Sequence, residues 1–294
     1  MIRIVTDSTA DLWQEYVEKR NIYVISMNYR LGENNYIATP DTSSPYYMED
    51  SAFYREMRAG VIAGTTQINQ AQYEEAFEGI LSQGDDILYV AFSSGLTGSQ
   101  NNARLVWEEL KEKYPERRMV MVDTRDASLG EGMAVWMVAE HFAAHPEISL
   151  DELADYAETI SAKVHHWFTV DDLKYLKRSG RVSGAAAVLG TVLNIKPVLH
   201  VDTEGHLIAV EKVQGRKKAM RRLVEQIEAH MADKQNGALF IGHCDAIEDA
   251  KFVDDLIEQK LGRRADKISG IGPVIGSHSG PGTLAVFYIS EDEK

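Results

Sequence analysis

The sequence has very little cysteine and no long apolar run. Cys244 is the single cysteine among 294 residues, which excludes an internal disulfide framework and suits a reducing compartment. No apolar stretch approaches the about 20 residues that a membrane-spanning helix needs. The N-terminus also lacks the basic, apolar and small-residue regions of a signal peptide. We therefore expect a cytoplasmic protein without a membrane span.

Positive charge is scarce as well. The chain has 31 Lys and Arg residues against 45 Asp and Glu residues, which gives a formal net charge of -14. A surface this acidic repels the phosphates of nucleic acids and anionic lipid surfaces, so we expect no nucleic-acid partner. Residues 216–222, Arg-Lys-Lys-Ala-Met-Arg-Arg, form a local basic exception.

Several catalytic and cofactor motifs are missing. The chain has no Gly-x-x-x-x-Gly-Lys-Ser/Thr loop, no Gly-x-Gly-x-x-Gly after the first strand and no Gly-x-Ser-x-Gly elbow. The neighbouring His165 and His166 would face opposite sides of a strand and cannot easily share a metal. His243, Cys244 and Asp245 are more typical of a strand end than of a ligand set. The sequence therefore predicts no cofactor and no metal.

The first half of the chain alternates strands and helices. Residues 2–5 and 21–29 read as strands around a short helix, and this β-α-β order predicts a parallel sheet. Further strands are expected at 87–92 and 118–122, each followed by a helix. An amphipathic helix covers 150–160. We place a domain boundary at its end, which gives an N-terminal α/β domain over 1–161.

The second half, residues 162–294, has a different pattern. A strand at 165–170 and a hairpin at 196–202 and 207–213 precede helices at 216–232 and 246–261, with a strand at 238–243 between them. A small apolar helix is expected at 185–193. The end of the chain predicts two strands, 274–278 and 283–289, around a Ser-Gly-Pro-Gly loop.

Two hydroxyl-rich turns each open a helix in the first half. Ser93 and Ser94 follow the apolar run 87–92, and Thr65 and Thr66 precede the helical pattern that starts near Tyr73. In an open α/β sheet the carboxyl ends of the strands form the ligand-binding edge. Hydroxyls and the free N–H groups of a helix start suit an anionic head group. Ordinary helix capping explains either turn equally well.

Two loop residues in the second half carry chemistry. Arg181 lies in the glycine-serine stretch 179–184, and His278 adjoins the Ser-Gly-Pro-Gly loop. Taken singly, each is more typical of a solvated loop residue than of a site.

Taken together, the motifs resemble the DegV family nearly end to end. Val5-Thr-Asp-Ser-Thr-Ala-Asp-Leu12 looks like its opening motif, and Ser93-Ser-Gly-Leu-Thr-Gly98 is similar to its Ser-Ser-x-Leu-Ser-Gly turn. Asp123-Thr with Ser128-x-Gly-x-Gly132 matches a further block. The most specific stretch runs over 173–183 and 193–198, and 276–282 matches the closing motif. One departure affects loop rigidity, because Ile68 stands where the family loop Thr-Ser-Gln-Pro has proline.

The resemblance implies a fold and a function. It implies two α/β domains, the first with a parallel Rossmann-like sheet and the second with a mixed sheet and helices, and a ligand between them. Characterised members are fatty-acid-binding subunits of a bacterial fatty acid kinase. Such a subunit is not an enzyme by itself. It buries a long-chain fatty acid, and a partner kinase that supplies ATP and magnesium converts the carboxylate to an acyl phosphate for phospholipid synthesis.

The resemblance also assigns residues. It implies that hydroxyls at Thr65 and Ser94 hold the carboxylate, with His278 close by; Ser93 and Thr66 are the neighbouring hydroxyls. It implies that arginines matching Arg181 and Arg216 help to dock the kinase. Since neither arginine sits in an apolar run, we expect both to project to solvent.

Two other functions stay open at the level of sequence. A serine esterase or thioesterase could use Ser94 and His278, but it needs a third, orienting carboxylate that the sequence does not reveal. A binder of another small anionic ligand, such as a sugar phosphate or a nucleotide, would need a polar pocket. The apolar segment 185–193 favours an apolar pocket instead.

Overall fold

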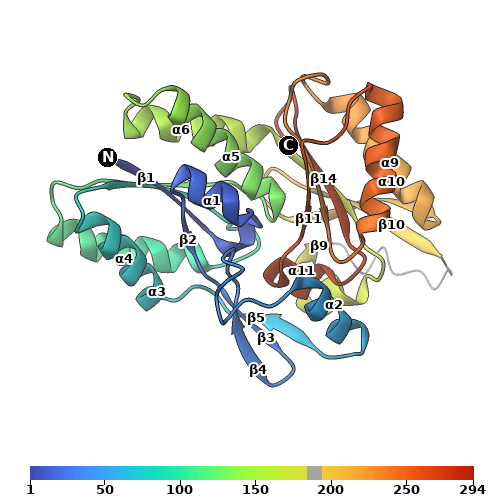
Figure 1. The fold of residues 1–294 in the computed structure, drawn as a ribbon, viewed down its shortest axis with the longest axis horizontal. Coiled ribbons are helices and arrows are strands. Elements are labelled where there is room, and N and C mark those ends of the chain that lie inside the picture. Colours follow the sequence, from blue (N-terminus) through green and yellow to red (C-terminus); the bar gives the residue numbers. More distant parts are fainter. Residues whose placement is uncertain (184–193) are drawn as a thin grey trace.

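The computed structural model describes residues 1–183 and 194–294, so the helix expected at 185–193 lies outside the described residues. Two groups of sheet and helix lie side by side, and a small third sheet lies below them (Figure 1). Within the described part of the chain, no helix is long and apolar enough to cross a membrane.

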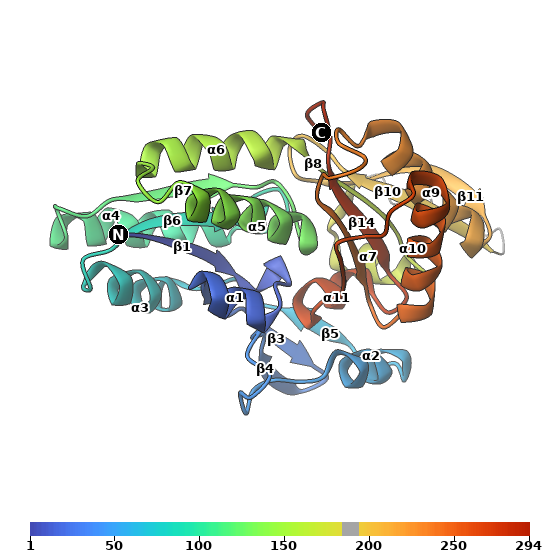
Figure 2. The same cartoon turned by 45° about the horizontal axis from the view of Figure 1, so that its top comes forward.

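The N-terminal sheet is parallel, as the β-α-β pattern predicts. Its order is β2 (Tyr23–Ile25), β1 (Ile2–Asp7), β6 (Asp86–Ala91) and β7 (Met119–Asp123), and every pair is parallel. Helices α5 (Leu129–Ala144) and α6 (Leu150–Lys163) lie above this sheet in Figure 2, and α3 (Gln70–Leu81) lies below it. α1 (Gln14–Arg20) and α4 (Ser99–Lys113) complete the layers. The predicted domain boundary at residue 161 falls in the last turn of α6 and stays a prediction.

The C-terminal sheet has seven strands and is mixed, which confirms the predicted fold class. Its order is β13 (Lys267–Gly270), β12 (Leu239–His243), β14 (Leu284–Ile289), β8 (Val164–Thr169), β10 (Ile195–Val201), β11 (Leu207–Gln214) and β9 (Val182–Ser183). The predicted hairpin is confirmed, because β10 and β11 pair antiparallel. α9 (Arg216–His230) packs on α10 (Ile247–Leu261) beside this sheet.

The strand predicted over 21–29 is wrong in its extent. It divides into β2 and β3 (Asn28–Leu31), and β3 joins β4 (Asn34–Ile37) and β5 (Ala63–Thr65) in a separate antiparallel sheet. Tyr29 and Leu31 are buried while Arg30 is exposed, the alternation of a strand with one face against the core. Gly32, at φ 62°, makes the turn to β4. α2 (Asp50–Arg58) lies between β4 and β5 in the chain.

The predicted strand at 274–278 is also wrong, because the chain forms helix α11 (Pro273–Ser279) there. Pro273 occupies the first helical position, where its missing N–H costs nothing. The backbone N–H of Gly276 donates to the carbonyl of Gly272, and that of Gly280 donates to Gly276. A seven-residue helix is too short for its period to stand out from an apolar run. His278 therefore lies on a helix and not in a loop.

Two carboxyl groups are buried together at the carboxyl end of β1. Thr6 and Thr9 donate hydrogen bonds to Glu131 at 3.0 and 2.7 Å, and the same Thr9 hydroxyl contacts Asp7. One hydroxyl proton cannot serve both carboxyl groups, so one of them has to be protonated. Burial is the main cause that raises the pKa of both groups, and the pKa of Glu131 lies well above its usual value.

We predict that Glu131→Gln makes the protein more stable than the wild type at pH 8. A raised folded pKa contributes stability below the unfolded pKa near 4.5, and that contribution is lost as pH rises. The amide keeps the hydrogen bonds without titrating. Urea unfolding at several pH values should show the two proteins converging towards pH 4.5. Glu112→Gln, on the exposed face of α4, is the control. A constant difference between Glu131→Gln and wild type across the pH range would contradict a protonated Glu131.

Candidate functional site

A cavity of about 90 Å³ lies where the two halves of the fold meet. Most of its wall is apolar and comes from both halves: Met27, Phe92, Leu96, Ala127, Phe168, Leu176, Leu207, Ile271, Val274, Ile275 and Ala285. The remaining lining residues are polar: Thr65, Thr66, Gln67, Thr97, Ser128, His166, Arg181, His278, Ser279 and Thr283. The site is therefore an apolar chamber with polar groups at selected points.

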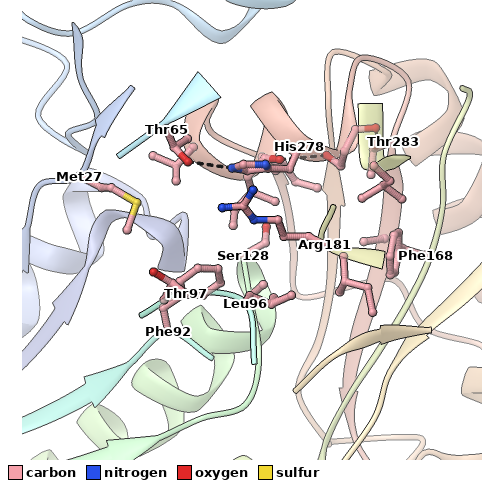
Figure 3. A pocket seen from close by; sticks show the side chains of 18 of the residues that line it. Met27, Thr65, Phe92, Leu96, Thr97, Ser128, Phe168, Arg181, His278 and Thr283 are labelled. Atoms are coloured by element: carbon pink, nitrogen blue, oxygen red, sulfur yellow. Dashed lines mark hydrogen bonds between the residues drawn. The ribbon is translucent and has the colours of Figure 1, made fainter. Parts of the chain in front are cut away.

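Thr65 and His278 form a hydrogen bond at one end of the cavity. Thr65 Oγ1 lies 2.8 Å from His278 Nε2, and Figure 3 shows the two side chains meeting across the cavity. Thr65 ends β5 and His278 lies in the last turn of α11, so the pair joins the two halves of the chain. Burial, followed by the charges of Arg181 and Arg178, lowers the pKa of His278 to about 4. At neutral pH the imidazole is therefore uncharged.

Arg181 points toward this pair from α7 (Lys174–Ser179) and its following turn (Figure 3). The residue is exposed, lines the cavity and donates a hydrogen bond to the carbonyl of Ser179. The solvent exposure expected from the sequence is present, but the guanidinium also faces the cavity. Thr65, His278 and Arg181 together offer two neutral polar groups and one cation to a ligand's polar end.

The loop that carries Thr65 and Thr66 is fixed by α4. Both threonines line the cavity, as does Gln67. Ile68 is fully buried; its N–H donates to Ser99 Oγ at 3.3 Å, and its carbonyl accepts from Asn102 at 2.8 Å. Proline at this position would have no N–H to donate. In this chain a hydrogen bond to α4 therefore holds the loop.

The two serines of the other turn do not line the cavity. Ser93 is fully buried and donates to the carbonyl of Gly205 at 2.9 Å. Ser94 is exposed and donates to Asp123 Oδ2 at 2.5 Å. Thr97, from the same turn, reaches the cavity instead. Sequence reasoning missed Thr97, although it lies in the same hydroxyl-rich turn, two residues before α4.

Arg216 does not project freely to solvent, so that expectation was wrong. Its Nε lies 2.9 Å from Asp249 Oδ2, its guanidinium donates to the carbonyl of Gly282, and only 18% of the side chain is exposed. The cause is its place at the start of α9, where the first turn of α10 and the 280–283 turn approach it. Sequence polarity alone could not reveal this packing.

The arrangement gives little support to an esterase. A serine nucleophile needs a hydrogen bond from its hydroxyl to a base. Ser94 pairs with Asp123, while His278 pairs with Thr65.

Over residues 1–183 and 194–294, no group of three or more His, Cys, Asp or Glu side chains could hold a metal ion.

We predict that His278 titrates far below an ordinary histidine. Burial and the nearby arginines disfavour the imidazolium, so the ring should stay neutral until the pH approaches about 4. Nitrogen-15 NMR of histidine-labelled protein between pH 8 and pH 4.5 measures this directly. A titration midpoint at or above 6.5 would contradict the buried, hydrogen-bonded position of the ring.

Comparisons with known proteins agree with this fold. A family model described as "Uncharacterised protein, DegV family" matches residues 1–291. A DegV domain-containing protein of Clostridium perfringens is 38% identical over 99% of this chain and 98% of its own length. A solved DegV family protein from Thermus thermophilus, described as binding fatty acid, superposes with a TM-score of 0.84. It is 27% identical and covers 98% of this chain and 99% of its own.

A second solved relative is similar in the same way. A fatty-acid-binding DegV family protein from Streptococcus agalactiae has a TM-score of 0.84 and 25% identity, with 99% of each chain covered. The family model, the sequence relative and the two structures each span almost the whole chain. This protein therefore belongs to the DegV family.

Proposed function

We propose that this protein binds a long-chain fatty acid, with the acyl chain in the apolar cavity and the carboxylate at the Thr65–His278 end. The observation that carries the proposal is the cavity itself, whose walls are mostly apolar and whose Thr65–His278 end is polar. The fatty-acid-binding relatives from Thermus thermophilus and Streptococcus agalactiae support it. A sugar phosphate or a nucleotide would instead need polar partners along most of its length.

The energetics favour the tail as the source of affinity. About 14 buried methylenes at about 0.8 kcal/mol each contribute about 11 kcal/mol before costs. Each hydrogen bond to the carboxylate adds only about 1.5–3 kcal/mol. Thr65, His278 and Arg181 would therefore set the register of the chain more than its affinity.

Binding also has to widen the cavity. Its volume of about 90 Å³ is well below the roughly 300 Å³ at which small-molecule pockets begin. The wall is made of separate elements, among them α7, α11 and the turn after β6, and small shifts of these would make room. Apolar side chains of the cavity wall would then exchange contacts with each other for contacts with the acyl chain.

The carboxylate end suits a group that has to react later. The Thr65 hydroxyl and the neutral imidazole of His278 orient a carboxylate without an ion pair that would reduce its nucleophilicity, while the exposed cation of Arg181 beside them is available to a partner. We propose that a partner kinase brings ATP to this end and forms an acyl phosphate, because the chain has no nucleotide-binding motif of its own. Arg181 is exposed beside the head-group end and is our first choice for the docking contact. Arg216 would first have to leave Asp249 to take part.

We predict that Thr65→Val weakens fatty acid binding by about 1–3 kcal/mol, because it removes a partly buried hydroxyl at the proposed head-group end. Ser94→Ala is the matched control and should change binding by less than about 0.5 kcal/mol, since its hydroxyl faces Asp123 outside the cavity. Titration calorimetry with palmitate measures both. Equal losses would mean that both Thr65 and Ser94 hold the carboxylate, as the family resemblance implies, and no loss in either variant would remove both from the site.

We predict that Arg181→Glu strongly reduces acyl phosphate formation by the partner kinase. Reversing an exposed charge at the docking surface weakens association, and added salt should weaken wild-type association, since screening acts over about 10 Å at 0.1 M. Arg104→Glu, on the exposed face of α4, is the control and should be silent. If the Arg181→Glu variant supports full acyl phosphate formation at limiting protein concentration, Arg181 has no docking role.

A further inference from the structure

His166 is a polar residue in the cavity wall that the proposed head-group site does not use. His166 comes from β8 and lies on the same face as Phe168, since side chains alternate along a strand. Both residues line the cavity, and His166 is only 5% exposed. Its ring packs against Phe168 and Phe287, with centroids 5.2 and 4.4 Å away.

One nitrogen of this ring is firmly held. His166 Nδ1 lies 2.8 Å from Asp126 Oδ1, and Asp126 is fully buried. The ammonium of Lys294 lies 2.9 Å from the other carboxylate oxygen, and that lysine side chain is 2% exposed. Burial alone would raise the pKa of Asp126, but Lys294 and His166 lower it to about 2. The ionised carboxylate therefore keeps a proton on Nδ1 of His166.

The other nitrogen, Nε2, has no hydrogen-bond partner among the described residues, and protein atoms do not seal it off. The space that this ring lines is the cavity. With Nδ1 always carrying a proton toward Asp126, Nε2 accepts a hydrogen bond in the neutral ring and donates one in the charged ring. An apolar chain laid against it would leave it unpaired, which costs free energy.

His166 is well separated from the head-group end. Thr283 bonds to the backbone of Ser279 and Gly280, next to His278. Phe287, which pairs with His166 across β14 and β8, lies four residues further along β14. At the usual rise per residue, this is about 13 Å along the strand. A carboxylate at Thr65 and His278 would thus leave Nε2 to face the acyl chain.

We propose that the cavity selects fatty acids that carry a hydroxyl group along the chain, and that this hydroxyl pairs with Nε2 of His166. The inference rests on the fatty-acid-binding function proposed above. A hydroxyl is the matching group because it both donates and accepts, and so satisfies Nε2 in either protonation state. A saturated hydrocarbon chain satisfies it in neither.

The test compares stearic acid with a series of monohydroxystearic acids that differ in the position of the hydroxyl. By titration calorimetry, at least one positional isomer should bind wild-type protein about five- to tenfold more tightly than stearic acid, as expected for one recovered hydrogen bond. In His166→Phe, stearic acid should still bind and the preference should disappear. His165→Phe is the matched control, because the neighbouring side chain faces the opposite side of β8, and it should keep the preference.

A second readout needs no variant. Nitrogen-15 NMR of the wild-type protein should show the Nε2 resonance of His166 moving with the preferred hydroxy acid and much less with stearic acid. If every isomer binds no better than stearic acid, or if His166→Phe keeps the preference, the role of His166 is overturned while fatty acid binding stands. If neither stearic acid nor any isomer binds, the proposed function itself fails.

Discussion

The hydrogen bond between Thr65 and His278 joins segments 213 residues apart at one end of the apolar cavity. It can form only because β5 belongs to a small sheet beneath the N-terminal layers, while α11 leads into β14, an interior strand of the other sheet. Both halves must therefore fold and meet before the site exists. The pair is also uncharged, since burial keeps His278 neutral, so the Thr65–His278 contact itself places no charge in the apolar wall.

Charge is distributed around the cavity in a consistent way. The protein as a whole is acidic, yet the carboxyl groups at the end of β1 are buried and Asp126 is neutralised by Lys294. The exposed cation at the head-group end is Arg181, where an anionic ligand end would meet solvent and a partner. An exposed cation beside the Thr65–His278 end would favour a carboxylate at that end of the cavity. The apolar wall then determines which chains fit.

The sequence predicted the sheets better than the site. Long periodic segments, such as β6 with α4 and the β10–β11 hairpin, carry their own signal, so their type was right. α11 was read as a strand because seven residues give no clear period, and this misplaced His278 in a loop. The hydroxyl turns were recognised, but which hydroxyl faces inward depends on the rotation of the turn. That is why Thr97 lines the cavity while Ser94 faces Asp123. The pairing of Arg216 with Asp249 could not be predicted either, because it depends on how α9 and α10 pack against each other.

The central question is which ligand the cavity binds, and one measurement addresses it directly. Protein purified without detergent is extracted with organic solvent, and the extract is analysed by mass spectrometry with an internal standard. An apolar cavity with a polar, carboxylate-sized end predicts a long-chain fatty acid at close to one molecule per chain. An extract free of fatty acid, together with no binding when fatty acid is added back to the extracted and refolded protein, would contradict the account.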